Sequence, residues 1–181
     1  MSLLDSANTL ILLIDMQPKI IKATKDKTII SYAQKLVKAA NLLSIPIIVT
    51  EQYPTGLGDT DPSLEELFPE DTKIVPKTAF SAMKEVGFSE LLRAYERKQI
   101  IICGVEAHIC VYQTAMDLVS RGYDVHFLKE ASASRSEYEF VSAIEQMRQA
   151  NISISTLETI LFELLEDSKN PHFKEIQAFV K

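Results

Sequence analysis

Apolar residues along the chain form short runs that alternate with longer segments in which they recur at helical spacing. In segments such as 28–44 and 136–150, apolar side chains return every three or four positions, which is typical of helices that bury one face. The intervening runs are shorter and mostly apolar, which indicates strands buried on both faces of a sheet. The expected strands are 9–15, 45–50, 72–77, 98–104, 123–130 and the start of 151–159.

Repeated alternation of strands and helices predicts parallel β-α-β units. The expected fold class is therefore α/β, with a doubly wound, mostly parallel six-stranded sheet and helices on both faces. The chain has 181 residues and no internal repeat, so we predict a single domain spanning 1–181. Hydrophobic residues make up 46% and charged residues 24%, as in average globular domains.

The charge balance narrows the range of partners. The formal net charge is -6 and the pI is about 5.1, whereas nucleic acids and anionic membranes favour basic surfaces. We therefore expect neither a nucleic acid nor a membrane as partner. The apolar run 10–14 follows no basic segment and is too short for a signal peptide or a membrane span. Two cysteines cannot build a disulfide framework, so reduced thiols and a cytoplasmic location are predicted.

Polar residues at the carboxyl ends of the expected strands are candidates for chemistry, because ligands bind at that edge of an open parallel sheet. Asp15 follows the first strand and could act as a general base. Lys77 ends the third strand and could hold that carboxylate ionised or favour a thiolate. Cys110 falls in the first turn of the helix after the fourth strand, where unpaired N–H groups favour a thiolate nucleophile. The structural alternatives are a turn-capping acid, a surface lysine and a small buried side chain.

Other residues are interpreted as structural. Cys103 lies inside an apolar run and is expected in the core. His108 lies two positions before Cys110, about 200° round a helix, so a Cys–His dyad is disfavoured. The sequence has neither an Asp-x-His pair nor a C-x-x-C motif, so we predict no metal site. It also lacks a glycine-rich nucleotide-binding loop, and no cofactor is expected.

Three stretches in order resemble the isochorismatase-like cysteine hydrolase superfamily. They are "LLIDMQ" (12–17), "VPKTAFSA" (75–82) and "IIICGVEAHICVYQTAMDLVSRGYDVHFLKEASASRS" (100–136). Two more, "VTEQYPTGLGDT" (49–60) and "NPHFKEIQ" (170–177), are similar to the isochorismatase domain-containing protein branch. The spacing of these stretches covers nearly the whole chain.

The resemblance implies a catalytic triad of Asp15, Lys77 and Cys110. In that family the cysteine attacks an amide or similar carbonyl, the aspartate moves the proton, and the lysine tunes both. The resemblance also implies a cis peptide between Val105 and Glu106, which would place the backbone N–H of Glu106 beside that of Cys110 as an oxyanion hole. It further implies a homo-oligomer.

A lowered pKa is expected for the Cys110 thiol. The helix N-terminus, the Lys77 charge and the amides of the loop implied by the resemblance should lower it, and Asp15 should oppose them. Cys110 should therefore react with iodoacetamide faster than Cys103, which has no such neighbours.

Two departures from the superfamily pattern bear on function. Metal-dependent nicotinamidases carry Asp-x-His after the second strand, where this chain reads "TEQYPTG", which disfavours metal-assisted nicotinamide hydrolysis. Glu130 stands where the family often has Asp, ahead of Ala131, Ser134 and Arg135, and is interpreted as a structural acid.

The sequence therefore predicts a cysteine hydrolase that cleaves the C–N bond of a small amide-like substrate through a thioester. Gln17, Tyr53 and Phe80 are candidates for the substrate pocket, because each lies next to a strand end that carries a triad residue. Three alternatives stay open: a catalytically idle interaction protein, a vinyl-ether hydrolase acting on isochorismate, and a redox-active thiol protein.

Overall fold

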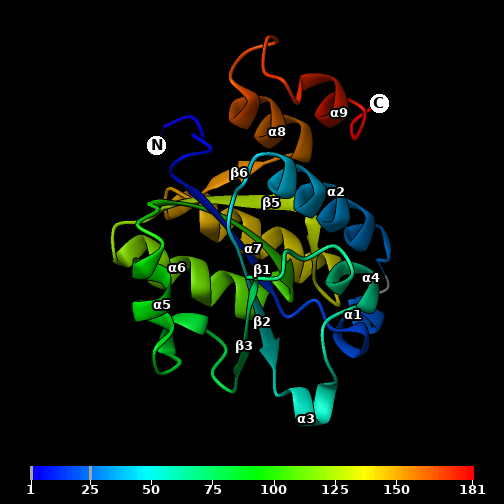
Figure 1. Ribbon diagram of the computed structural model, residues 1–181. Helices are drawn as coiled ribbons and strands as arrows, with labels where there is room; N and C mark the ends of the chain where they lie inside the picture. Colours follow the sequence, from blue (N-terminus) through cyan, green and yellow to red (C-terminus); the bar gives the residue numbers. More distant parts are fainter. Residues whose placement is uncertain (1, 25) are drawn as a thin grey trace.

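The computed structural model describes residues 2–24 and 26–181, and within them six strands form one sheet. The strands are β1 (Thr9–Ile14), β2 (Ile47–Gln52), β3 (Lys73–Lys77), β4 (Gln99–Val105), β5 (Asp124–Ala133) and β6 (Ser153–Ser155). Their order is β3-β2-β1-β4-β5-β6, and every neighbouring pair is parallel. The predicted doubly wound fold is confirmed, with a sheet that is parallel throughout (Figure 1).

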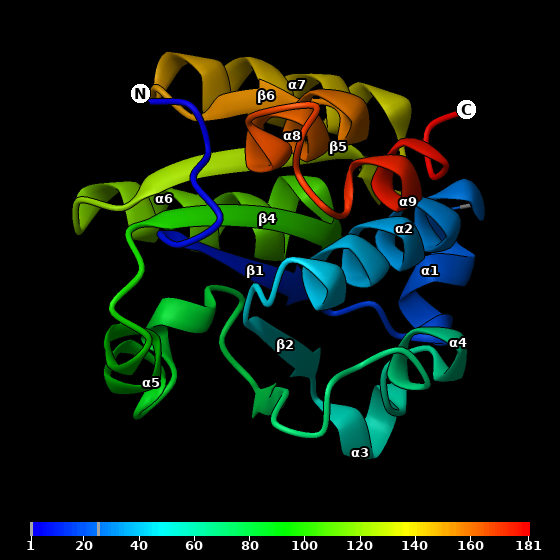
Figure 2. The same cartoon turned by 45° about the horizontal axis from the view of Figure 1, so that its top comes forward.

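Helices cover both faces of this sheet. One face carries α1 (Pro18–Thr24), α2 (Thr28–Leu42), α8 (Leu157–Leu165) and α9 (Phe173–Gln177), which Figure 2 brings to the front. The other face carries α5 (Phe88–Ala94), α6 (Tyr112–Ser120) and α7 (Glu137–Gln149). Two single-turn helices, α3 (Pro54–Leu57) and α4 (Pro62–Glu65), lie in the connection from β2 to β3.

The position of β1 in the middle of the sheet explains why residues 10–14 are a continuous apolar run. Successive side chains of a strand point to opposite faces, and in this sheet both faces are covered. Ile11 and Leu13 are buried in the core on the α2 and α8 side. Leu12 and Ile14 are buried in the core on the α5 and α6 side. All the residues of β1 are buried, so no position is left for a polar side chain facing solvent.

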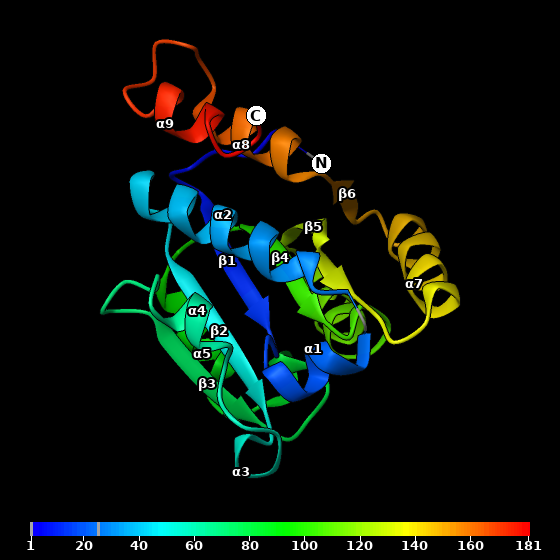
Figure 3. The same ribbon diagram turned by 90° about the vertical axis from the view of Figure 1, so that its right-hand side faces the viewer.

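The strand order reverses at β1. From β1 the chain builds β2 and β3 on one side, and it then builds β4, β5 and β6 on the other. At the end of β1, Ile14 is paired with Thr50 of β2 and with Gly104 of β4. Such a reversal of strand order is where open α/β sheets bind ligands. Figure 3 shows β1 and β2 pointing toward the part of the molecule that holds α1 and α3.

Some boundaries differ from those predicted. The helix expected from about residue 106 begins with a π-helical turn, Ala107–Val111, and becomes α-helical at Tyr112. The fifth strand continues to Ala133, because a register shift next to Gly104 lets the end of β5 pair again with β4. The C-terminal helix is short and spans Phe173–Gln177.

No helix in the described part of the chain is both long enough and apolar enough to cross a membrane.

Candidate active site

Asp15 directly follows β1 and is fully buried. Its backbone has a positive φ of 52°, and its N–H donates to the carbonyl of Thr50 at 3.0 Å. The Thr50 hydroxyl donates to Asp15 Oδ1 at 2.6 Å, and the Lys77 ammonium meets Asp15 Oδ2 at 2.7 Å. The side chains of Asp15 and Lys77 are both 0% exposed, so they form an ion pair shielded from water.

Lys77 reaches this carboxylate across a strand, because β2 lies between β1 and β3. Its Nζ also donates to Gln52 Oε1 at 2.6 Å, and it lies 3.2 Å from each of the carbonyl oxygens of Ala79 and Phe80. A buried ion pair is tolerated when further hydrogen bonds satisfy its remaining donors and acceptors, and Gln52 and Thr50 supply them here. The sequence assigned no role to Gln52 or Thr50.

Cys110 lies in the π-helical turn after β4 and is 7% exposed. The pKa of its thiol is raised to about 12, mainly by burial and then by the negative charge of Asp15, while the Lys77 ammonium acts to lower it. The expectation of a lowered pKa is therefore wrong. The helix-terminus argument is local, whereas the dominant causes are desolvation by the surrounding chain and a carboxylate brought in from another strand.

Cys103 is fully buried in β4, as expected of a core residue. Burial raises the pKa of its thiol to about 12 as well. Only Cys110 has Asp15 and Lys77 acting on it, so the two thiols share a high pKa for different reasons.

The arrangement favours proton transfer coupled to attack. A thiol that keeps its proton at neutral pH is a weak nucleophile, and a neighbouring carboxylate activates it by taking that proton as the sulfur reacts. Asp15 is a carboxylate whose charge acts on this thiol, and it is paired with the Lys77 ammonium.

The segment before Cys110 is tied to the end of β5. The peptide bond between Val105 and Glu106 is cis. The Glu106 carboxylate accepts the backbone N–H of Arg135 at 3.0 Å and pairs with Arg135 Nη2 at 3.0 Å. His108 Nδ1 lies 2.9 Å from the Ser134 hydroxyl. These links join residues that are far apart in sequence, and no local sequence pattern indicates them.

Gly104 allows β1 and β4 to approach closely beneath the site. Its φ is +134°, and a Cβ built on it would lie 2.0 Å from the carbonyl oxygen of Ile14. The Gly104 N–H donates to the Ser132 hydroxyl at 3.1 Å, which in turn donates to the carbonyl of Leu128 at 2.9 Å. The glycine therefore sets the spacing between the strands that carry Asp15 and lead to Cys110.

The three candidates for the substrate pocket occupy different environments. Gln17 is fully buried, and its amide bonds to the backbone of Gln52 and Gly58, so it positions the loop after β2. Tyr53 and Phe80 are 56% and 54% exposed, and the carbonyl of Phe80 accepts from Lys77. Both aromatic residues therefore lie on the surface close to the buried ion pair.

Two further acids have structural roles. Glu130 accepts the backbone N–H of Leu157 at the start of α8, which confirms its interpretation as a structural acid. The buried Glu51 carboxylate accepts the backbone N–H and the hydroxyl of Thr60 at 2.7 and 2.8 Å, and so closes the loop between them. Within the described residues, no three His, Cys, Asp or Glu side chains are grouped so as to hold a metal ion.

The fold matches that of isochorismatase-like hydrolase structures. The chain belongs to the isochorismatase domain family, whose model matches residues 9–159. It is 41% identical over 178 residues to isochorismatase domain-containing protein 2 of Danio rerio, which covers 98% of this chain and 89% of the relative. The human protein of the same description is 39% identical over 153 residues, covering 84% and 73%.

Solved structures show the same fold. A Caenorhabditis elegans protein described as MAR1 ribonuclease superposes with a TM-score of 0.93 and 38% identity, covering 99% of this chain and 92% of that one. The YcaC gene product of Escherichia coli, described as an octameric hydrolase of unknown specificity, has a TM-score of 0.88 and 26% identity, covering 98% and 94%.

Proposed function

We propose that this protein is a cysteine hydrolase that cleaves the C–N bond of a small amide-like substrate through a thioester. The observation that supports this most is the buried Asp15–Lys77 ion pair, whose two charges both act on the Cys110 thiol. Buried groups with strongly perturbed pKa values at the ligand-binding edge of a sheet are characteristic of catalytic sites.

In the first half-reaction, the Cys110 sulfur attacks the substrate carbonyl carbon while its proton passes to the Asp15 carboxylate. Asp15 then gives this proton to the substrate nitrogen, the C–N bond breaks, and the acyl group remains on Cys110 as a thioester. Lys77 stays protonated throughout and stabilises the negative charge on Asp15. The backbone N–H groups of Glu106 and Cys110 are the proposed donors to the carbonyl oxygen as it becomes negative.

In the second half-reaction, water attacks the thioester and Asp15 accepts its proton. The C–S bond breaks, the proton returns to the departing sulfur, and the acid product leaves. Atoms balance with amide and water consumed and an amine and a carboxylic acid formed. No metal, cofactor or redox partner enters either step.

The exposed rings of Tyr53 and Phe80 are proposed to guide the substrate toward Lys77 and Cys110. The E. coli relative is described as octameric, and we propose that this chain also forms a homo-oligomer. Both cysteines are free, which fits a reducing compartment such as the cytoplasm. Ribonuclease activity, the description of the C. elegans structure, is less favoured here, because a net charge of -6 does not attract a phosphate backbone.

The test is intact-protein mass spectrometry after brief incubation with a library of small amides and carbamoyl compounds. We expect a mass increase equal to the acyl group, mapped to Cys110, together with turnover that falls by a factor of about 10² or more in Asp15→Asn. Cys103→Ala is the matched control and should keep both the adduct and the turnover.

Each other outcome selects an alternative. Turnover retained in Cys110→Ala, above all on a vinyl ether, would contradict the thioester mechanism. Absence of both adduct and turnover across the library would favour an interaction protein. Reversible oxidation of Cys110 without hydrolysis would favour a redox thiol.

A further inference from the structure

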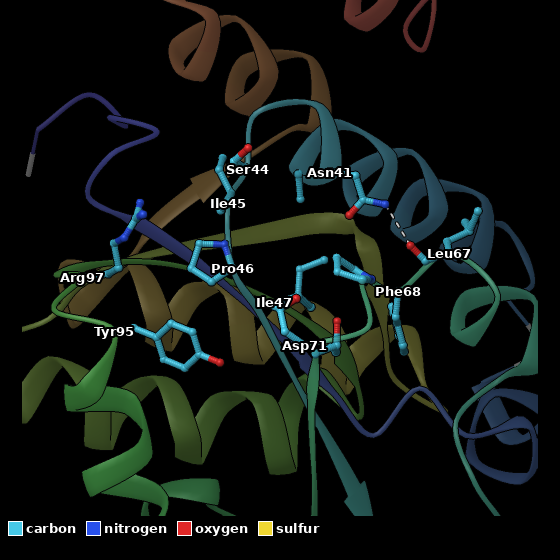
Figure 4. Close-up of a pocket in the computed structure, with 13 residues that line it drawn as sticks. Asn41, Ser44, Ile45, Pro46, Ile47, Leu67, Phe68, Asp71, Tyr95 and Arg97 are labelled. Atoms are coloured by element: carbon cyan, nitrogen blue, oxygen red, sulfur yellow. Dashed lines mark hydrogen bonds between the residues drawn. The ribbon is translucent and has the colours of Figure 1, made fainter.

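A cavity lies at the opposite edge of the sheet, where β2 and β3 begin (Figure 4). Its volume is about 570 Å³, which is within the range of small-molecule sites. Its walls are formed by the end of α2, the connection into β2, residues 67–69 with Asp71 and Thr72 before β3, and the segment after α5. None of Asp15, Lys77 and Cys110 lines it, so binding there is independent of the proposed hydrolysis.

The polar groups of this cavity are mostly acceptors and hydroxyls. Burial raises the pKa of Tyr95, and the negative charge of Asp71 adds to that effect, so the Tyr95 hydroxyl is neutral and lies within the field of Asp71. Figure 4 shows this hydroxyl pointing to the side of the cavity where Asp71 lies. Thr72 contributes a buried hydroxyl oxygen that has no hydrogen-bond partner among the described residues.

Two of the side chains that line the cavity donate to backbone carbonyls of the protein. The Asn41 amide donates to the carbonyl of Leu67 at 2.9 Å, as the dashed line in Figure 4 shows. The Arg97 guanidinium turns toward the N-terminal segment and donates to the carbonyl of Ser6 at 2.6 Å. In the described part of the chain, Asp71 has no ion-pair partner. Its exposed carboxylate is therefore free to accept a hydrogen bond from a cationic donor that enters the cavity.

Apolar side chains complete the wall around this carboxylate. Ile47 is buried, and Pro46, Phe68 and Pro69 line the cavity beside it. We propose that the cavity binds a small amphipathic amine, with its ammonium group on Asp71 and the Tyr95 hydroxyl and its hydrocarbon body against Ile47 and Phe68. A hydrogen bond between an ammonium and a carboxylate is charge-assisted, which gives the amine its advantage over a neutral molecule of the same shape.

The test uses the intact protein and a defined probe, 2-phenylethylamine, in an NMR titration of backbone amides. We expect saturable shifts around Ile47, Phe68 and Tyr95 with a Kd roughly in the millimolar range, as befits a fragment. The neutral analogue 2-phenylethanol should bind about tenfold more weakly, because it lacks the charge that meets Asp71.

Three variants distinguish specific binding of the amine in this cavity from general attraction of a cation to an acidic protein. Asp71→Asn should weaken amine binding about tenfold, and Tyr95→Phe should weaken it severalfold. Glu70→Gln is the matched control, because it removes an adjacent exposed charge that does not line the cavity and should change the Kd less than about twofold. Thermal melts establish that each variant is folded.

The proposal is overturned by any of three results. The first is no saturable shift, or shifts that cluster away from this cavity. The second is equal binding of the amine and the alcohol. The third is an equal effect of Asp71→Asn and Glu70→Gln. That result would mean that the overall negative charge of the protein, and not this cavity, attracts the amine.

Discussion

In the proposed mechanism, Cys110 is a nucleophile that is not ionised before the reaction. Burial and Asp15 hold the proton on its sulfur, and Lys77 opposes them without prevailing, so the resting group is a thiol. A cysteine that was already ionised before substrate bound would react with any electrophile that reached it. Transfer of the proton only at the moment of attack restricts reaction to molecules that fit against the thiol and the carboxylate together.

Alkylation by iodoacetamide tests this description of Cys110. With a pKa near 12, the thiolate fraction increases about tenfold per pH unit, so the rate should climb from pH 7 to pH 10 without a plateau. Asp15→Asn removes a charge that raises this pKa, so alkylation should become faster at a given pH while hydrolysis is lost. Timed labelling with peptide mapping measures both cysteines, and Cys103 serves as the monitor of unfolding.

A plateau near neutral pH would show that Cys110 is already a thiolate, as the helix-terminus argument had predicted. Slower alkylation of Asp15→Asn would show that Asp15 does not oppose ionisation of the thiol.

At the scale of elements, the site depends on how closely β1 and β4 approach. Asp15 follows β1, and the segment that carries Cys110 follows β4. Gly104 leaves no room for a Cβ against Ile14, and the Ser132 hydroxyl holds its N–H from the β5 side. The ion pair between Glu106 and Arg135 and the contact between His108 and Ser134 then fix the direction of the chain that leaves β4. Both partners lie directly after β5.

Replacement of glycine by alanine at positions 104 and 122 distinguishes the effect of backbone strain on stability from the effect of a steric clash. Gly122 has a φ of +81° with nothing within 4 Å of a built Cβ, so Gly122→Ala should lower the free energy of unfolding by only about 1–2 kcal/mol. Gly104→Ala adds a clash with Ile14 and should lower it by about 3 kcal/mol or more. Urea denaturation of both variants makes the comparison, and equal losses would show that β1 and β4 can separate freely.

Sequence patterns located the elements better than they described the contacts between them. Burial on both faces makes residues 10–14 of β1 apolar, and Asp15 was selected because it follows this run. The roles of Gln52 and Thr50 were not assigned, because they depend on which strands become neighbours. The sign of the pKa shift of Cys110 was missed for the same reason, since the groups that bury it come from distant segments.

At the scale of the whole molecule, one buried ion pair connects three strands. Lys77 at the end of β3 reaches over β2, where it contacts Gln52, to Asp15 at the end of β1. Two charges without access to water depend on each other, because each is costly to bury alone. The pair therefore couples the edge of the sheet to its centre.

A double-mutant cycle measures this coupling. Lys77→Met leaves the Asp15 carboxylate buried without its counter-ion and should lower the free energy of unfolding by about 3–5 kcal/mol. Adding Asp15→Asn removes the stranded charge, so the double variant should be more stable than Lys77→Met alone. Chemical denaturation of the four proteins gives the coupling energy, and additive losses would mean that the pair contributes to chemistry without holding β3 to the sheet.

The order of the strands also divides the proposed active site between two portions of the chain. Asp15 and Lys77 lie before residue 78, Cys110 lies after it, and between them the side chain of Val86 is fully exposed on a connecting segment. A polypeptide opened near Val86 would yield one piece that carries the Asp15 carboxylate and the Lys77 ammonium and another that carries the Cys110 sulfur. Neither piece alone would hold a complete set, so turnover would appear only on their reunion. The two pieces would therefore act as a split reporter, in which hydrolysis is measured only when the two polypeptides associate.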